Sequence, residues 1–404
     1  MEQVKVLNVP DSRQACPDFF ATLNEWQATG LAYGSENLFI GRAKDLEGRL
    51  TTAKRIPPGS HLLLPTSGSS SDRPRLVVLS RRALQASEDA TSKALGGPGN
   101  WALLLPLAHI AGMQVALRAL RAGEAPIVPA SWPKVDLEAF GHDLAGCDPA
   151  EKQHPLYTSL VSAQLAQLLE QGEEVLAGFR SFDAILVGGG RLDPELIQTA
   201  RSLGLRVVTT YGMTETAGGC VYDGKPLPGT RLEVDDLGQI LISTPSLMES
   251  YLDQETKWRQ VDGELFWETG DLGRLSGEGV LQVTGRADSI VKSGGIKVDL
   301  DRVERALAEL GGILDAACAP VPDAKWGQIV GALVVTQAGV EPGQIHLALR
   351  RSLPAACVPR VIVPSQELPR SPLGKVRRGQ VSSLIAEALR DGRAWTHHSR
   401  GGVR

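Results

Sequence analysis

A run of small hydroxyl residues around one glycine follows a short apolar segment in this chain and could bind phosphate. The segment HLLLP at 61–65 is followed by TSGSSSDRPR at 66–75. Backbone N–H groups and hydroxyl groups can converge on phosphate oxygens in such a loop, and an arginine adds a cation. Taken alone, the same composition would equally suit a serine-rich surface loop, and the spacing of a Walker loop is absent. The candidate phosphate ligands are Thr66, Ser67, Gly68, Ser69, Ser70 and Arg75.

Two further stretches lie about twenty residues apart and offer what a magnesium–nucleotide complex needs. Three glycines at 188–190 end an apolar run, and glycines at a strand end let a flat ligand lie close to the backbone. Thr214 and Glu215, in the run TTYGMTET at 209–216, offer a hydroxyl and a carboxylate, which are the hard oxygen ligands that Mg²⁺ prefers. In isolation the glycines would also fit an ordinary turn, and Glu215 would also fit a solvated carboxylate.

Further acidic and basic motifs follow in the last third of the chain. ETGD at 268–271 is followed by GRAD at 285–288 and KSGG at 292–295. A carboxylate such as Asp271 commonly caps its own backbone in a tight turn, but it could instead accept both hydroxyls of a ribose. Lys375 lies in PRSPLGKVRR at 369–378, where a single lysine would ordinarily be a solvated charge. The order of these motifs, and no single one of them, supports a functional interpretation.

The elements that must position these motifs alternate in type over the first half of the chain. Buried strands are predicted at 61–65, 76–80, 101–106, 184–190 and 205–212. Helices are predicted between them at 81–93, 112–122, 160–171 and 194–203. Strands that alternate with helices predict a layered α/β architecture with largely parallel sheets.

The pattern changes near Gly229. The segments 230–244, 264–280 and 281–290 predict short antiparallel strands joined by tight turns. After position 291, helices at 299–310 and 344–352 with strands at 316–322 and 329–335 predict a small α+β domain. The prediction is therefore an α/β protein with a large N-terminal layered domain over 1–286, which includes a β-rich part, and a small mobile C-terminal α+β domain over 287–404.

The composition is ordinary for a globular protein and gives no support to several other classes. Hydrophobic residues make up 42% and charged residues 22% of the 404 residues. The net charge of −4 does not favour a nucleic-acid binder, and the N-terminus has no signal-peptide core. No apolar run approaches the roughly 18 residues of a membrane span. Five scattered cysteines without metal-ligand spacing favour reduced thiols, and these features together predict a cytoplasmic location.

Taken in order, the motifs resemble those of the adenylate-forming superfamily, which includes acyl-CoA synthetases, luciferases and the adenylation domains of peptide synthetases. The family's phosphate loop T-S-G-[ST]-T-G-x-P-K is similar to 66–75, and its Y-G-x-T-E is similar to 211–215. Its T-G-D corresponds to 269–271, its G-R-x-[DK] to 285–288 and its P-x-x-x-x-G-K to 369–375. Five motifs in the same order, spread over about 300 residues, argue against a chance match.

The resemblance implies a two-step reaction that uses ATP, Mg²⁺ and coenzyme A to convert a small carboxylic acid into its thioester. It implies that the hydroxyl loop and Arg75 hold the β- and γ-phosphates, while Thr214 contacts the α-phosphate and Glu215 holds Mg²⁺. Lys375 would bridge the acyl carboxylate and the α-phosphate in the first step. The remaining implied nucleotide contacts are Gly188, Gly189 and Gly190 at the adenine, Tyr211 stacking nearby, and Asp271 and Arg286 at the ribose.

In the second step the CoA thiol must stand where Lys375 stood. The resemblance implies that the C-terminal domain rotates about a hinge at Asp288. Gly294 and Gly295 would then line the pantetheine path, since backbone without side chains permits close approach.

The phosphate loop departs from the family pattern in three ways. Ser71 stands where the second glycine is usual, one extra residue precedes Pro74, and Arg75 replaces the usual lysine. Arginine keeps the charge but not the point-like geometry of an ammonium group.

Three segments indicate which carboxylic acid is the substrate. The segments 105–118, 157–161 and 218–224 resemble those of o-succinylbenzoate–CoA ligases of menaquinone biosynthesis. A benzoate with a second carboxylate and a ketone needs a polar, partly cationic pocket. Taken singly, Arg118 would as readily be a charge on a helix surface, and His109 could be a hydrogen-bonded core residue. The pocket candidates are His109, Arg118, Ser159, Gly218 and Gly219.

Two other functions stay open on the sequence alone. One is a CoA ligase for a different aryl or acyl acid. The other is a non-catalytic nucleotide-binding relative, which the altered phosphate loop allows.

Overall fold

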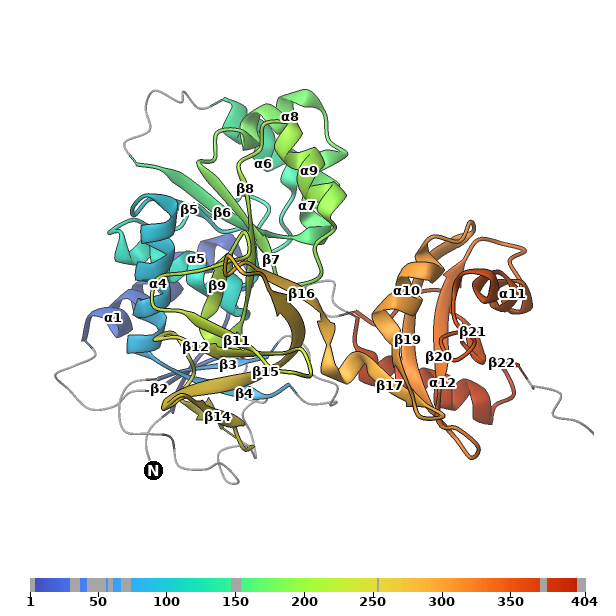
Figure 1. Ribbon diagram of the computed structural model, residues 1–404. Coiled ribbons are helices and arrows are strands. Elements are labelled where there is room, and N and C mark those ends of the chain that lie inside the picture. Colours follow the sequence, from blue (N-terminus) through green and yellow to red (C-terminus); the bar gives the residue numbers. More distant parts are fainter. Residues whose placement is uncertain are drawn as a thin grey trace, which may run out of the picture.

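A computed structural model of the chain describes residues 4–29, 37–41, 56, 61–66, 74–146, 154–252, 254–370 and 376–397. Within these residues the helices and strands form a larger and a smaller body (Figure 1). The chain passes between the two where strand β16 (Leu281–Arg286) runs into the short 3-10 helix η4 (Ala287–Ser289).

The first sheet of the larger body places the ends of the hydroxyl loop. β3 and β4 form an antiparallel hairpin in which Pro65 pairs with Leu76, so the segment 66–75 connects their ends. β13 pairs with β4 and brings Tyr251 beside Val77, close to the same loop. In order across the sheet, the strands are β1 (Val4–Leu7), β2 (Asn37–Ile40), β3 (His61–Pro65), β4 (Leu76–Ser80) and β13 (Ser250–Tyr251).

The second sheet gathers the glycine and threonine motifs at one edge. Its strands β5 to β8 are parallel, and Val161 pairs with Gly188 at the carboxyl ends of β6 and β7. Ligands of open α/β sheets bind beyond the carboxyl ends of the strands, so this edge is a candidate site. In order across the sheet, the strands are β10 (Lys225–Pro226), β9 (Gly218–Tyr222), β8 (Val207–Met213), β7 (Ala184–Gly188), β6 (Leu156–Val161) and β5 (Asn100–Ala102).

Helices cover both faces of the second sheet. The core between the two sheets includes apolar side chains of α1 (Cys16–Thr29), α4 (Arg81–Leu95) and α5 (Ile110–Arg121). A separate core on the opposite face is closed by α6 (Leu137–Ala145), α7 (Ser162–Leu169), α8 (Glu173–Phe179) and α9 (Pro194–Ser202). Side-chain caps fix where some of these helices begin; Ser80, for example, accepts a hydrogen bond from the backbone of Ala83.

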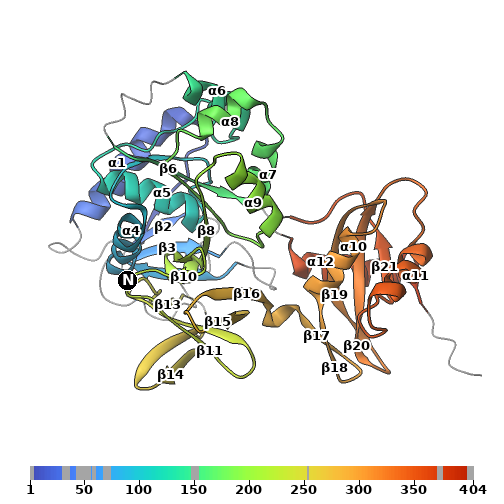
Figure 2. The same ribbon diagram turned by 45° about the horizontal axis from the view of Figure 1, so that its top comes forward.

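The remaining strands form two more sheets. An antiparallel sheet in the larger body contains β11 (Arg231–Val234), β12 (Gln239–Ser243), β14 (Trp258–Val261), β15 (Glu264–Leu275) and β16. The smaller body is a sheet with helices packed on it (Figure 2). Its strands are β17 (Ile290–Ser293), β18 (Ile296–Asp299), β19 (Ile313–Asp323), β20 (Gly327–Thr336), β21 (Val361–Pro364) and β22 (Trp395–Thr396), and its helices are α10 (Leu300–Ala308), α11 (Pro342–Ser352) and α12 (Arg378–Arg390).

The predicted fold class is confirmed, whereas several predicted elements were too long; the strand predicted at 184–190, for example, ends at Gly188. The strand predicted at 101–106 ends at Ala102, where the chain leaves the sheet. The carbonyl of Leu104 then accepts a hydrogen bond from the side chain of Gln164. The helix predicted at 160–171 begins only at Ser162, since the residues before it pair in β6. The domain boundary after Arg286 and the mobility of the C-terminal part stay predictions. In the described part of the chain, no helix is both long and apolar enough to cross a bilayer.

Candidate active site

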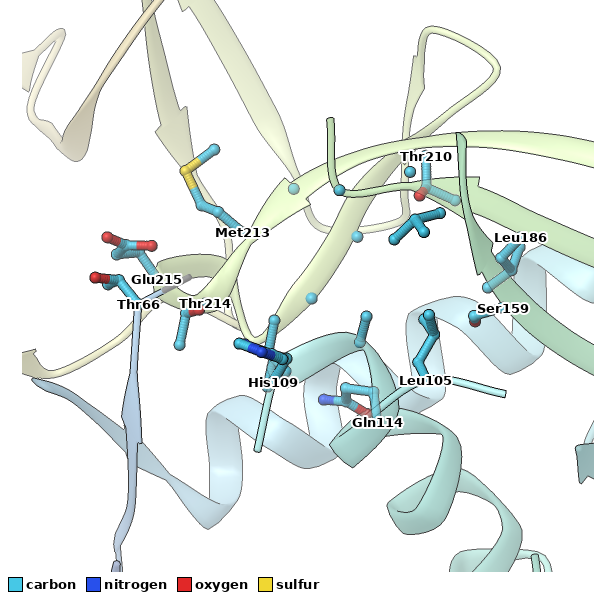
Figure 3. A pocket seen from close by; sticks show the side chains of 18 of the residues that line it. Thr66, Leu105, His109, Gln114, Ser159, Leu186, Thr210, Met213, Thr214 and Glu215 are labelled. Carbon is cyan, nitrogen blue, oxygen red and sulfur yellow. The ribbon is translucent and has the colours of Figure 1, made fainter. Parts of the chain in front are cut away.

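One pocket of the larger body is lined by residues from most of the predicted motifs (Figure 3). Thr66 and Glu215 lie side by side at one end of the view, and Ser159 and Leu186 lie at the other. We call the part around Thr66, Arg75, Thr214 and Glu215 the anion-binding end, and the part around His109, Gln114, Arg118, Ser159, Gly218 and Gly219 the acid pocket. The predicted residues in the lining are Thr66, Arg75, His109, Arg118, Ser159, Gly188, Gly189, Thr214, Glu215, Gly218, Gly219 and Arg286.

Glu215 is held in the pocket by a tight turn after β8. It lies in the 3-10 turn Thr214–Thr216, where the hydroxyl of Thr216 accepts a hydrogen bond from the backbone of Met213 at 3.0 Å. The next residue, Ala217, has a left-handed backbone with φ of 49°, and its carbonyl accepts a hydrogen bond from Nε2 of Gln114 at 2.8 Å. The turn is therefore fastened at both ends, which fixes the direction of the Glu215 side chain.

A buried tyrosine joins Glu215 to Arg75. The hydroxyl of Tyr251 donates a hydrogen bond to Oε1 of Glu215 at 2.7 Å and accepts one from Nη1 of Arg75 at 3.1 Å. The guanidinium of Arg75 also lies 5.0 Å from the centre of the Tyr251 ring. Burial, followed by the Glu215 carboxylate, raises the pKa of Tyr251 above its usual range, so the hydroxyl stays protonated and can donate.

The two ends of the hydroxyl loop are fastened to each other. The backbone N–H of Thr66 donates to the carbonyl of Arg75 at 2.8 Å, and the backbone N–H of Arg75 donates to the hydroxyl of Thr66 at 3.1 Å. The loop therefore starts and ends at the pocket. Four of its predicted ligands lie outside the described residues, namely Ser67, Gly68, Ser69 and Ser70.

Asp271, the predicted ribose ligand, has both carboxylate oxygens engaged. Tyr211 donates its hydroxyl to Oδ2 at 2.9 Å, and Arg286 donates Nη1 to Oδ1 at 2.9 Å. The hydroxyl of Thr269 accepts from the backbone of Asp271 and donates to a carbonyl of β12, which fixes the turn. Burial and the Asp271 carboxylate raise the pKa of Tyr211 well above its usual range. Asp271 and Tyr211 do not line the pocket themselves, whereas Thr269 and Arg286 do.

The three glycines at the end of β7, Gly188, Gly189 and Gly190, differ in how strongly the structure requires a glycine at each position. A Cβ on Gly188 would lie 2.2 Å from the hydroxyl of Thr210, so no other residue fits beside β8 at this position. Gly189 has φ of 79°, a conformation that glycine adopts without strain. Gly190 is exposed and does not line the pocket.

The acid pocket contains a buried cation. Arg118 is only 8% exposed, and its guanidinium lies 5.1 Å from the centre of the Trp101 ring. It lies one helical turn after Gln114 on α5, so both side chains share a face of the helix. A Cβ on Gly218 would lie 3.9 Å from Nη2 of Arg118 and 3.6 Å from the hydroxyl of Ser87, and the absence of one leaves these groups accessible.

These buried polar groups are incompletely satisfied. Within the described residues, Nε of Arg118, Oε1 of Gln114 and Oγ of Ser87 are buried without a hydrogen-bond partner. Buried polar atoms in native proteins are nearly always paired, so a cluster of unpaired ones beside a pocket indicates a ligand or ordered water. The lining also includes Ser159 of β6 and His109, which precedes α5.

Several predicted residues either do not line this pocket or lie outside the described part of the chain. Gly294 and Gly295 form the turn between β17 and β18, with φ of 56° and 83°, and do not line it. A Cβ on Gly294 would lie 2.4 Å from the ring of Trp326 and collide with it, so packing against Trp326 explains why glycine occupies this position. Asp288 lies in η4, and its side chain is not among those described. Lys375 lies outside the described residues.

The sequence reasoning missed two residues of the site. Tyr251 lies in a two-residue strand about 35 positions after the Thr-Glu motif, and no pattern around it indicates a contact with Glu215. Gln114 could have been found, because it is a polar residue within the apolar run IAGMQVAL and is spaced four positions from Arg118.

Comparisons with known proteins agree with the geometry. The family model of AMP-binding enzymes matches residues 22–252, and that of the AMP-binding enzyme C-terminal domain matches residues 302–375. A probable 2-succinylbenzoate–CoA ligase of Mycobacterium tuberculosis is 38% identical over 352 residues, which cover 85% of this chain and 89% of that protein. The indoleacetate–CoA ligase of Aromatoleum aromaticum is 28% identical over 359 residues, which cover 82% of this chain and 69% of that protein.

Solved structures share the fold. The o-succinylbenzoate CoA synthetase of Bacillus subtilis in complex with its acyl-adenylate intermediate superposes with a TM-score of 0.70 at 21% identity, covering 94% of this chain and 87% of that one. The same synthetase in complex with ATP and magnesium gives a TM-score of 0.64 at 25% identity, covering 79% of this chain and 69% of that one.

Proposed function

The chain belongs to the AMP-binding enzyme family, and from that premise we propose that it is an o-succinylbenzoate–CoA ligase. It activates the acid with ATP to give an acyl-adenylate and pyrophosphate, and then transfers the acyl group to coenzyme A with release of AMP. The observation that carries the proposal is one pocket that combines an anion-binding end at Arg75 with a buried cation, Arg118, in the acid pocket. A substrate with two carboxylates fits it, since one can react while the other pairs with Arg118.

The anion-binding end suits a polyphosphate. Arg75 contributes a guanidinium whose orientation is fixed by Tyr251, and Thr66 and Thr214 contribute hydroxyls. Attack of a carboxylate on an anionic phosphate is opposed by charge repulsion, which fixed cations and donors offset. Lys375 supplies a further cation in the first step, as the family motif implies.

The residues also fit a magnesium ion. Among the described residues of the lining, Glu215 is the carboxylate, and no group of three His, Cys, Asp or Glu side chains there could hold a metal by itself. Mg²⁺ typically takes one or two carboxylates and completes its shell with substrate phosphates and water, which suits a lone Glu215. When bound, it neutralises charge on the phosphates. The hydrogen bond from Tyr251 fixes the Glu215 carboxylate in the lining of the pocket.

The acid pocket supports recognition of a second carboxylate. Within the described residues Nε of Arg118 has no hydrogen-bond partner, and a carboxylate can accept two parallel hydrogen bonds from a guanidinium. Ser159 and His109 add polar contacts suited to a ketone, and Gly218 with Gly219 leaves room for the aromatic ring.

The second step follows from the family's domain rotation. The segment at Gly285–Asp288 is the hinge, and the C-terminal domain turns about Asp288 to bring Gly294 and Gly295 to the pantetheine arm of coenzyme A. The reaction belongs to menaquinone biosynthesis, and the enzyme acts in the cytoplasm.

A panel of acids tests the proposal. The purified protein is supplied with ATP, Mg²⁺ and coenzyme A and with o-succinylbenzoate, benzoate, phenylacetate, indoleacetate or a fatty acid, and AMP and thioester are measured. Thioester is expected with o-succinylbenzoate at the highest kcat/KM. A higher kcat/KM with a monoacid would show that the protein is a CoA ligase for that acid instead. If no acid gives AMP, the protein is a nucleotide-binding relative without ligase activity.

Arg118→Met provides the matched structural test. Methionine keeps much of the apolar stem but removes the charge. The variant should lose kcat/KM for o-succinylbenzoate by roughly 10²-fold, as expected for a hydrogen-bonded charge pair, while its KM for ATP is unchanged. An unchanged KM for the diacid would show that Arg118 is not the second carboxylate's partner.

A further inference from the structure

A buried carboxylate lies behind the acid pocket and has no part in the chemistry described above. Glu88, on α4, is 2% exposed. Its Oε1 accepts a hydrogen bond from Nε2 of Gln27 on α1 at 3.4 Å, and its Oε2 lies 3.6 Å from Nη1 of Arg121 on α5. A carboxylate at such a position is costly unless it is paired or protonated, so a neighbouring cation or a proton must stabilise it.

The surroundings of Glu88 bring the pKa of its carboxyl group close to neutral pH. Burial raises its pKa from the usual value to about 7, and the guanidinium groups of Arg121 and Arg118 partly oppose this shift. Asp89 raises the pKa further and Arg81 lowers it, both from α4 itself, while Gln27 is neutral. Glu88 therefore changes charge in the range where an enzyme of this kind works.

Glu88 and the acid pocket share Arg118. Ser87, which precedes Glu88, and Nη2 of Arg118 both lie within 4 Å of the position that a Cβ of Gly218 would take. Arg118 lines the pocket, whereas Glu88 does not. Arg118 lies three positions before Arg121 on α5, so the cation of the acid pocket and the cation beside Glu88 are neighbours on one face of that helix, and the charge of Arg118 lowers the pKa of Glu88.

We propose that Glu88 is a positioning residue whose carboxylate competes with the second carboxylate of the substrate for Arg118, so that binding of a diacid is coupled to uptake of a proton by Glu88. The inference rests on the proposed function, because it needs an anion in the acid pocket. A protonated Glu88 leaves Arg118 free to pair with the substrate, whereas an ionised Glu88 attracts Arg118 and repels the incoming anion.

The direction of the pH effect follows from this competition. Below a pH of about 7 Glu88 is mostly neutral and the diacid binds well. As the pH rises through this value, Glu88 ionises, and its negative charge weakens the binding of the anionic diacid. A coupling of one pKa unit corresponds to a tenfold change in affinity, so the KM for the diacid should rise about tenfold between pH 6 and pH 9.

The test compares Glu88→Gln with the wild type and with Glu138→Gln. The last variant removes an exposed carboxylate on α6, which is not among the charges that shift the pKa of Glu88, and so controls for the change in net charge. Acid-dependent exchange between ATP and pyrophosphate gives KM and kcat at each pH without coenzyme A. The substrates are o-succinylbenzoate and 4-oxo-4-phenylbutanoate, which lacks the ring carboxylate.

Glu88→Gln should keep a low, pH-independent KM for o-succinylbenzoate, whereas the wild type and Glu138→Gln show the tenfold rise. The monoacid should show no such rise in any of the three proteins, and kcat should change little. A pH profile of KM that is the same in Glu88→Gln and in the wild type would overturn the inference. No exchange by the wild type with o-succinylbenzoate would instead refute the proposed function.

Calorimetry of the wild type keeps the inference testable if Glu88→Gln does not fold. Binding of o-succinylbenzoate in the presence of α,β-methylene-ATP is measured at pH 7.5 in buffers of different ionisation enthalpy. Net uptake of a substantial fraction of a proton with the diacid, and none with the monoacid, is expected. Equal proton uptake with both acids, or none with either, would contradict the coupling.

Discussion

Replacing Tyr251 by phenylalanine removes one oxygen atom from the centre of the anion-binding end and leaves the ring in place. The hydroxyl donates to Glu215 at 2.7 Å and accepts from Arg75 at 3.1 Å, and Tyr251 itself is 3% exposed. The ring contact with the Arg75 guanidinium does not need the hydroxyl. The substitution therefore isolates the two hydrogen bonds.

The expected loss can be worked from these contacts. A hydrogen bond to a charged group contributes about 1.5–3 kcal/mol, and each 1.36 kcal/mol corresponds to tenfold in rate or affinity. Removing a side chain that orients a metal ligand typically costs 10- to 100-fold in metal affinity or activity. Tyr251→Phe should therefore lower kcat/KM for ATP in the first half-reaction by roughly 10- to 100-fold and raise the Mg²⁺ concentration needed for half-maximal rate.

The assay is acid-dependent ATP–pyrophosphate exchange over a Mg²⁺ titration, together with calorimetric binding of Mg²⁺–ATP. Tyr157→Phe is the matched control, since its buried hydroxyl donates to the carbonyl of Leu95 at 3.0 Å outside the pocket. That variant should lose stability but keep the wild-type Mg²⁺ titration. If Tyr251→Phe also keeps it, the bridge through Tyr251 does not orient Glu215.

Three further substitutions test individual groups. Glu215→Gln keeps the shape but removes the anionic ligand, so it should raise the Mg²⁺ requirement by more than Tyr251→Phe does, and an unchanged Mg²⁺ titration would make Glu215 structural. Lys375→Ala should slow formation of the adenylate by roughly 10²–10³-fold or more yet leave transfer from pre-formed acyl-adenylate to coenzyme A near the wild-type rate; equal loss in both steps would refute a step-specific role. Asp288→Pro fixes φ near −65° and should impair thioester formation more than adenylate formation, so equal losses in separately measured half-reactions would argue against a hinge.

The sequence predicted elements well where a single local pattern decides the outcome. The strands at 61–65 and 76–80 were predicted with their observed bounds, because each is a short apolar run ended by turn residues. The run 101–106 looks equally apolar, yet the strand ends at Ala102, and the carbonyl of Leu104 accepts a hydrogen bond from the side chain of Gln164, far along the chain. Such tertiary competition is invisible in a local window.

The same contrast holds for the site. Glu215 and Thr214 could be named from the sequence because the motif is contiguous and chemically specific. Tyr251 could not, since it reaches Glu215 only through the antiparallel pairing of β13 with β4, a contact between positions far apart in the chain. Glu88 was also missed, because a glutamate on an amphipathic helix is normally exposed and only the packing of α1, α4 and α5 buries it.

Transfer of an isotopic label tests the central claim most directly, because attack of a carboxylate on the α-phosphate leaves one carboxylate oxygen on AMP. The protein is incubated with ATP, Mg²⁺, coenzyme A and o-succinylbenzoate in which all carboxylate oxygens are ¹⁸O. The masses of AMP and pyrophosphate are then measured by mass spectrometry. Reaction through an acyl-adenylate leaves one ¹⁸O atom in each AMP formed and none in pyrophosphate. Unlabelled AMP, or label in the pyrophosphate, would contradict an acyl-adenylate and with it the proposed function.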